Sequence, residues 1–311
     1  NCRESYYSQG KKDLKKSYLY ILISLIILMV GTSCAYRRPF YPEYWFQALG
    51  QEGEFVMTAD ISRLKEGEGK EIVDQSLFDN PIASKAERIS LSLIPQENDS
   101  YPLPLSSFVV GGAVEGKFST LVVNTSLKFS GYMKTKENGI VRYKGDGMSV
   151  YAPLKNLILF TDGDYDDLYD RTISSREKVI EDSVAEAMAT SLFSLYVFEP
   201  ETLMDIGFEI PQVVLDEMEK TCILFDERGG EMVMTGIIET TGDGTARALS
   251  TLLKNQVVQE KRRNGETLDT KLLSTYFSVE DNVVKIIGYP LSSAMKEKAR
   301  GLMSSGIGGL F

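Results

Sequence analysis

Hydrophobic positions follow two patterns along this chain. Near the start they form one nearly unbroken run, Tyr18–Val30, with four lysines before it and small residues after it. From Gly53 onward they alternate, or recur every three to four residues, as in half-buried strands and amphipathic helices. The first pattern predicts an export or membrane segment, and the second predicts a folded mixture of strands and helices.

The apolar run has the layout of a secretory signal peptide. Lys11, Lys12, Lys15 and Lys16 supply the charged region that precedes such a run. A spanning helix needs roughly 20 apolar residues, so this run is short for one, although a thinned span can accommodate it. Two interpretations stay open, a cleaved signal peptide and an uncleaved amino-terminal anchor. In both, the lysines predict that the chain beyond the run crosses the membrane.

The end of the run is Val30-Gly31-Thr32-Ser33-Cys34. It resembles the lipobox of bacterial lipoproteins, in which a small residue precedes the cysteine that receives a lipid. Gly31 stands where leucine is usual, and relaxed boxes of this kind are similar to those of spirochaete lipoproteins. The resemblance implies that residues 1–34 are a signal peptide or membrane anchor and that Cys34 is the lipid attachment site. It also implies palmitate-type acylation and an exported, membrane-anchored location in a bacterial cell envelope.

Residues 35–52 form an aromatic tether after this cysteine. The tether contains Trp45 and Phe46 among several tyrosines, and two arginines lie near its start. Aromatic and arginine side chains suit the membrane–water interface. The alternative is that these aromatics pack onto the domain that begins nearby.

Beyond the tether the pattern predicts an α/β (α+β) fold. Strands are expected around residues 54–61, 88–94, 107–114, 148–152, 157–160, 192–198, 222–225, 232–238 and 283–287. Helices are expected over residues 117–129, 176–190, 211–220, 245–258 and 292–303. In the first helix Phe118, Leu121, Val122, Thr125 and Phe129 share one face, and in the fourth Leu249, Leu252, Leu253 and Val257 do so. We expect such faces to cover the sheet.

Two parts of the chain resemble each other. Phe108–Glu115 matches Met232–Glu239 at an offset of 124, and residues 156–161 match 282–287 at an offset of 126. This predicts two similar halves, 53–173 and 192–311, joined by a linking helix at 174–191. Each would be a mainly antiparallel or mixed sheet covered by amphipathic helices. A groove between the halves would suit a small apolar or lipid ligand. The alternative is chance recurrence of strand–helix–strand patterns.

Composition removes several kinds of chemistry. The chain has no histidine, which excludes histidine-dependent catalysis and histidine metal sites. Its net charge is −10, so nucleic acid is not an expected partner. The cysteines are Cys2, Cys34 and Cys222, too few for a disulfide framework beyond the anchor. Cys222 lies in an apolar run and is predicted to be a small buried hydrophobe.

The acidic run Thr161–Asp170 is the strongest candidate for metal chemistry. Asp162, Asp164 and Asp166 alternate as calcium ligands do, but an EF-hand loop needs glycine at its sixth position and glutamate at its twelfth. Asp167 and Ile173 occupy those positions, so we expect helix capping instead. We therefore assign no catalytic, cofactor-binding or metal-binding residue.

These observations favour a non-enzymatic, membrane-tethered envelope lipoprotein that acts as a binding or structural module. One alternative is a lipid-binding or membrane-inserting protein that uses its amphipathic helices. Some spirochaete lipoproteins insert such helices, and the chain resembles them in VGTSC and in helices such as Leu249–Val257. A second alternative is a hydrolase that depends on carboxylates or serine, because no histidine is available.

Overall fold

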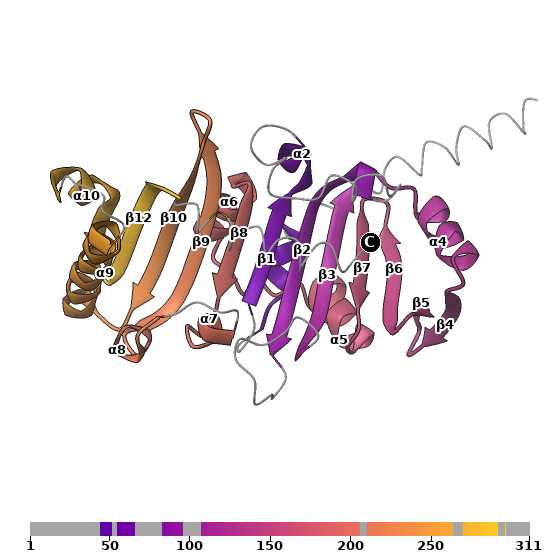
Figure 1. Cartoon of the computed structure of the whole chain (residues 1–311). Helices are drawn as coiled ribbons and strands as arrows, with labels where there is room; N and C mark the ends of the chain where they lie inside the picture. Colours follow the sequence, from indigo (N-terminus) through magenta and orange to yellow (C-terminus); the bar gives the residue numbers. More distant parts are fainter. Residues whose placement is uncertain are drawn as a thin grey trace, which may run out of the picture. The chain divides into compact units, whose positions relative to one another are not determined.

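The fold is organised around one antiparallel sheet. The computed structural model describes residues 44–51, 55–65, 83–95, 107–205, 210–263, 270–291 and 296. Its strands lie in the order β11-β12-β10-β9-β8-β1-β2-β3-β7-β6-β5-β4 (Figure 1). Every neighbouring pair is antiparallel. The chain is thus a mixed α/β protein with a large antiparallel sheet and several helices, in agreement with the coarse prediction.

The strands are β1 (Phe55–Asp60), β2 (Ala86–Pro95), β3 (Phe108–Gly116), β4 (Met133–Glu137), β5 (Ile140–Gly145), β6 (Met148–Leu154), β7 (Leu157–Thr161), β8 (Phe193–Val197), β9 (Met218–Arg228), β10 (Glu231–Thr240), β11 (Phe277–Glu280) and β12 (Val283–Pro290). The helices are η1 (Trp45–Ala48), α2 (Ile61–Leu64), η3 (Ala83–Lys85), α4 (Thr120–Phe129), α5 (Tyr165–Tyr169), the π-helix η5 (Asp170–Ser175), α6 (Asp182–Thr190), α7 (Thr202–Asp205), α8 (Gln212–Leu215), α9 (Asp243–Arg263) and α10 (Thr270–Tyr276).

Strand alternation divides the core into two layers. On β1, Phe55 and Met57 point to one face of the sheet, and Val56 points to the other. The first face is packed by side chains of α2, α4, α7, α8 and α9. The second is packed by η1, α5 and α6. Both faces of the central strands are therefore buried, which explains their nearly continuous apolar sequences.

The pair formed by β1 and β8 lies in the interior of the sheet. On one side of it the order runs β1-β2-β3-β7-β6-β5-β4, and on the other side it runs β8-β9-β10-β12-β11. Phe55 lies opposite Val197 and Ala59 opposite Phe193. The sheet is thus continuous between the two predicted halves.

The carboxyl end of the aromatic tether packs onto the domain. Trp45 and Phe46 are 1% and 0% exposed and join the core beneath η1. Gln47 fixes this segment, because its Nε2 donates to the carbonyl of Ile180 at 3.1 Å and to Asp182 Oδ1 at 2.8 Å. For Trp45 and Phe46 the packing interpretation is confirmed. Residues 35–43 lie outside the described residues.

Three helix predictions need correction or lie outside the described residues. The helix predicted over 211–220 is only the single turn α8, because the chain enters β9 at Met218. The helix predicted from Arg176 begins at Asp182, because Arg176 has a left-handed backbone (φ 55°) after the π-helix. Most of the segment 292–303 is not described.

Candidate functional site

Helix α4 exposes the apolar face that the sequence assigned to the core. Leu121 is 77% exposed, Val122 54% and Phe129 88%, whereas Val123 and Leu127 are buried. The expectation that this face covers the sheet is wrong for these three residues. The helix has apolar residues on two sides. Val123 and Leu127, on the side with fewer apolar residues, pack over β5 and β6.

The two ends of α4 determine which side turns inward. Phe118, just before the helix, is buried in the core. At the other end Gly131 has φ 88°, and Tyr132 N donates to Leu127 O at 3.0 Å, which closes the helix with a left-handed cap. Because Phe118 and Leu127 are both fixed in this way, the helix cannot rotate to bury Leu121, Val122 and Phe129. We call Leu121, Val122 and Phe129 the α4 stripe.

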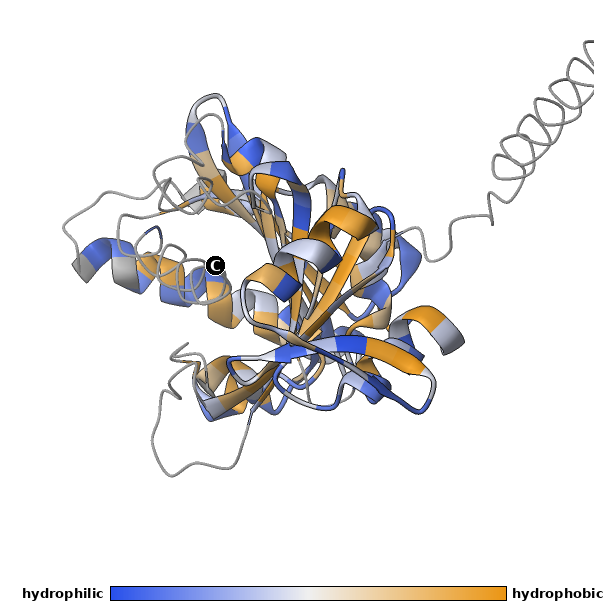
Figure 2. Cartoon of the chain, turned by 90° about the vertical axis from the view of Figure 1, so that its right-hand side faces the viewer, coloured by the Kyte–Doolittle hydropathy of each residue, from blue (hydrophilic) through white to orange (hydrophobic). Residues whose placement is uncertain are grey.

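Exposed lysines lie on α4 and on the sheet face that α4 covers. Lys128 is exposed on the helix itself, and Lys134 and Lys136 are exposed on the edge strand β4. Lys134 lies opposite Tyr143, whose ring joins the core on the face that α4 covers, so both β4 lysines project to that face. In Figure 2 this end of the sheet faces the viewer, and hydrophobic and hydrophilic positions lie side by side on it. We call the stripe and these three lysines the α4 surface.

The β4–β5 hairpin beneath this surface is held by a buried arginine. Arg142 Nη1 donates to Asp166 Oδ1 at 2.7 Å, and its Nη2 forms an ion pair with Glu137. Asn138, in the left-handed turn, donates to Asp166 Oδ2 at 2.8 Å. The guanidinium also lies 5.8 Å from the ring centre of Tyr165. The tip of the hairpin is thereby tied to α5.

The acidic run is distributed among separate structural contacts. Asp164 caps α5 and accepts from the amide of Asp166 at 2.8 Å, as the sequence predicts. Asp162 accepts from the amide of Val110 at 2.7 Å, and Asp167 pairs with Arg171 at 3.1 Å. Across the described ranges, no group of three or more acidic or cysteine side chains is arranged to hold a metal ion.

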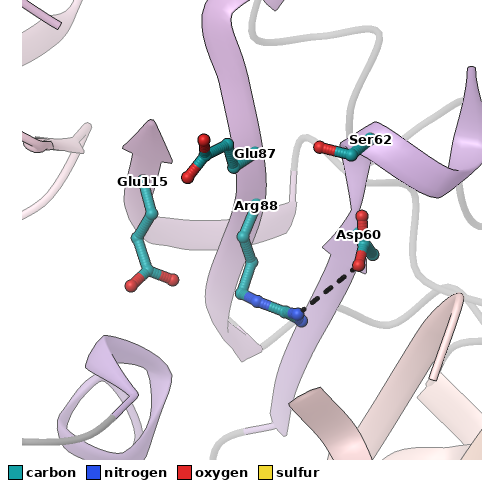
Figure 3. Close-up of a pocket in the computed structure, with 5 residues that line it drawn as sticks. All are labelled: Asp60, Ser62, Glu87, Arg88 and Glu115. Atoms are coloured by element: carbon teal, nitrogen blue, oxygen red, sulfur yellow. Dashed lines mark ion pairs between the residues drawn. The ribbon is translucent and has the colours of Figure 1, made fainter. Parts of the chain in front are cut away.

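A polar pocket lies where β1, β2 and β3 meet α2 (Figure 3). Its cavity volume is about 330 Å³, and it is lined by Asp60, Ser62, Glu87, Arg88 and Glu115. Figure 3 shows the Arg88 guanidinium directed at Asp60, and the two lie 3.8 Å apart. Arg88 also donates to Ala189 O at 2.5 Å, at the carboxyl end of α6. The contacts of Arg88 with Asp60 and Ala189 therefore stabilise the fold.

Glu115 is the pocket residue with altered acidity. Burial raises its pKa from 4.5 to about 7; Arg88 opposes that rise and Glu87 adds to it. The hydrolase alternative requires two carboxyls that face each other across a cleft. In Figure 3 the carboxyl groups of Glu87 and Glu115 do not point toward one another. The pocket therefore gives no geometric support to paired-carboxylate catalysis.

Two cysteines were singled out by the sequence. Cys222 is 2% exposed, and burial raises its thiol pKa to about 12, so it is the buried hydrophobe that the sequence predicts. Cys34 lies outside the described residues. None of the helices in the described part of the chain is both long and apolar enough to cross a membrane.

Comparison with known proteins gives a fold and no family. The sequence matches no protein-family profile and no curated protein. Among solved structures it is similar to TP0453. Crystal form I has 12% identity and a TM-score of 0.52, over 86% of this chain and 98% of that chain. Crystal form IV has 14% identity and a TM-score of 0.53, over 83% and 96%. The likeness extends along nearly all of TP0453, and at this identity it shows the fold alone.

Sequence reasoning missed the lysines of the α4 surface. A count of charged residues would have found them, because residues 117–155 carry a net positive charge within a chain whose net charge is negative. The basic residues there are Lys117, Lys128, Lys134, Lys136, Arg142, Lys144 and Lys155, and the acidic ones are Glu137 and Asp146. No comparable signal marks Glu115, whose burial depends on three strands and a helix that are distant in sequence.

Proposed function

We propose that this chain is a non-enzymatic module, tethered to a cell-envelope membrane through a lipid on Cys34, whose binding surface is the α4 surface. The observation that carries the binding assignment is the α4 stripe. Three large apolar side chains face solvent on a helix that has a separate buried face. Large contiguous apolar exposure is typical of an interaction site. The lipobox-like Val30–Cys34 supports the tether, and the fold shared with TP0453 is compatible with it.

Intact mass spectrometry of the full chain, extracted from bacterial membranes, tests the tether. The expected product begins at Cys34 and carries the mass of a diacylglyceryl group and its acyl chains. The Cys34→Ser variant should lose that mass. An unmodified chain that retains residues 1–34 would contradict the lipoprotein assignment.

A second candidate function is contact with the bilayer itself, as in a membrane-inserting protein. The observation that favours it is the composition of the α4 surface, in which Leu121, Val122 and Phe129 are accompanied by lysines. A helix that lies in a membrane interface buries such an apolar stripe and keeps lysines at the headgroups.

Tryptophan quenching in the full chain tests this contact. The one native tryptophan, Trp45, is buried in the core, so Phe129→Trp adds an exposed reporter. With the chain reconstituted in vesicles of brominated lipid, we expect strong quenching of the Phe129→Trp reporter. The control is Val213→Trp, at a 62% exposed apolar position on α8. Equal quenching at both positions would count against a specific α4 contact.

We also propose that the chain consists of two duplicated halves that meet at the β1–β8 pair. Apart from the additional edge strands β5 and β4, the strand orders β1-β2-β3-β7-β6 and β8-β9-β10-β12-β11 match and support this. The placement of α4 after β3 and of α9 after β10 also supports it. Superposition of residues 108–161 on 232–287 tests it. Equivalent residues should follow the sequence offsets of 124 and 126, and any other alignment would contradict the duplication. A small apolar or lipid ligand between the halves stays a prediction.

A further inference from the structure

We infer that the α4 surface selects a bilayer that contains anionic lipid headgroups. This inference rests on the proposed membrane contact and names its lipid class. Two observations carry it, the apolar stripe and the reversal of charge around the stripe.

The charge reversal is large. Residues 117–155 contain seven basic and two acidic residues, within a chain of 34 basic and 44 acidic residues. The other residues therefore contain 27 basic and 42 acidic ones. An anionic membrane repels the negatively charged surfaces of a protein and attracts a positively charged one. The basic segment is thus the part of the folded domain that such a membrane attracts.

Charge and apolar exposure coincide on the same side of the sheet. Lys128 lies on α4 itself, and Lys134 and Lys136 lie on β4 on the face that α4 covers. Within the described residues none of these three lysines has an ion-pair partner, whereas Lys144 pairs with Glu137 at 3.0 Å. Lysine side chains have long flexible stems, which can place ammonium groups at lipid phosphates while neighbouring apolar side chains enter the acyl region.

Vesicle composition separates this inference from the membrane contact on which it depends. The Phe129→Trp chain is reconstituted in brominated vesicles of pure phosphatidylcholine, or of phosphatidylcholine with about one third phosphatidylglycerol. We expect quenching in the anionic vesicles and little in the neutral ones. We also expect its loss near 1 M salt, where the Debye length falls to about 3 Å.

A variant that lacks the three lysines provides a second test of the inference. Lys128→Gln, Lys134→Gln and Lys136→Gln together should weaken docking to anionic vesicles roughly fivefold per lysine at low salt. Lys85→Gln, Lys220→Gln and Arg262→Gln remove the same charge from exposed positions elsewhere and should leave docking unchanged. Circular dichroism of both triple variants confirms that the fold is retained.

The outcomes are distinct. Equal quenching in neutral and anionic vesicles would overturn anionic selection and keep the membrane contact. Absence of quenching in both would overturn the membrane contact together with the inference. If the lysine variant instead changes the oligomeric state and leaves vesicle docking intact, the basic surface serves a second copy of the chain, and the inference is wrong.

Discussion

Helix α4 follows strand β3 and helix α9 follows strand β10, and the apolar residues of the two helices differ in their burial. On α9, Leu249 is 1% exposed, and Leu253 and Val257 pack against the cores beneath. The predicted burial is wrong for Leu252, which is 42% exposed. On α4, three apolar residues of the predicted face are in solvent and two others are buried. An apolar stripe therefore shows that a helix is amphipathic without showing which partner the stripe has.

Length and anchoring explain the difference. Helix α9 has 21 residues, and its length lets Leu249, Leu253 and Val257 contact the core along several turns. Helix α4 has ten residues, carries apolar side chains around most of its circumference, and is fixed at both ends by Phe118 and the Gly131 cap. Its orientation is set by its ends, and its exposed stripe is left for another surface.

The largest expected effect is at the core face of α9. Leu249→Ala should lower the free energy of unfolding by about 2–5 kcal/mol, because it leaves a cavity in a closely packed core. Urea denaturation followed by circular dichroism measures the change. Leu252→Ala, at a 42% exposed position on the same helix, is the matched control. A similar loss in both variants would contradict the one-sided burial of α9.

The second effect tests how the α4 end of the sheet is held. Arg142→Ala removes the buried partner of Asp166 and Glu137, so we expect a loss of about 2–4 kcal/mol in unfolding free energy. Hydrogen exchange should rise first in β4 and β5, because the hairpin loses its tie to α5. Lys285→Ala, which breaks the exposed pair with Glu280 at the α9 end, should cost less than about 1 kcal/mol. Comparable losses would show that both ends rely equally on charge.

The sequence predicted the strands well and the solvent-facing side of α4 badly. Alternation locates β2, where Ile89, Leu91 and Leu93 recur at every second residue, and short apolar runs locate β1 and β3. The capping role of Asp164 is equally local. The exposure of Phe129, the burial of Trp45 and the environment of Glu115 depend on elements far away in the chain, so no local pattern reports them. The charge reversal in residues 117–155 was present in the sequence and, together with the apolar stripe, was an available sign of the α4 surface.

The third effect is a pH dependence located on the α4 half of the sheet. The folded state raises the Glu115 pKa to about 7, so between pH 4.5 and 7 the native protein holds a proton that the unfolded chain has lost. Stability from this group is therefore complete below about pH 4.5 and falls as the pH rises to 7, by on the order of 2 kcal/mol.

Glu115→Gln removes that dependence and tests it. Relative to the native protein, the variant should gain unfolding free energy as the pH rises from 4.5 to 7, measured by urea titrations at fixed pH values. Glu239→Gln, at a partly buried position of β10, is the control. A constant difference between Glu115→Gln and the native protein across this window would contradict the raised pKa.

The smallest expected effect decides the comparison between the two helices. Phe129→Ala should change the unfolding free energy by less than about 0.5 kcal/mol, because the side chain is 88% exposed. A phenylalanine in a core would cost about 3–5 kcal/mol on the same change, so the two cases are well separated. If urea denaturation without lipid shows the larger value, α4 buries its stripe as α9 does, and the α4 surface is not a binding site. A near-zero value, together with loss of vesicle docking in Phe129→Ala but not in Val213→Ala, would show that the stripe serves binding and contributes little to folding.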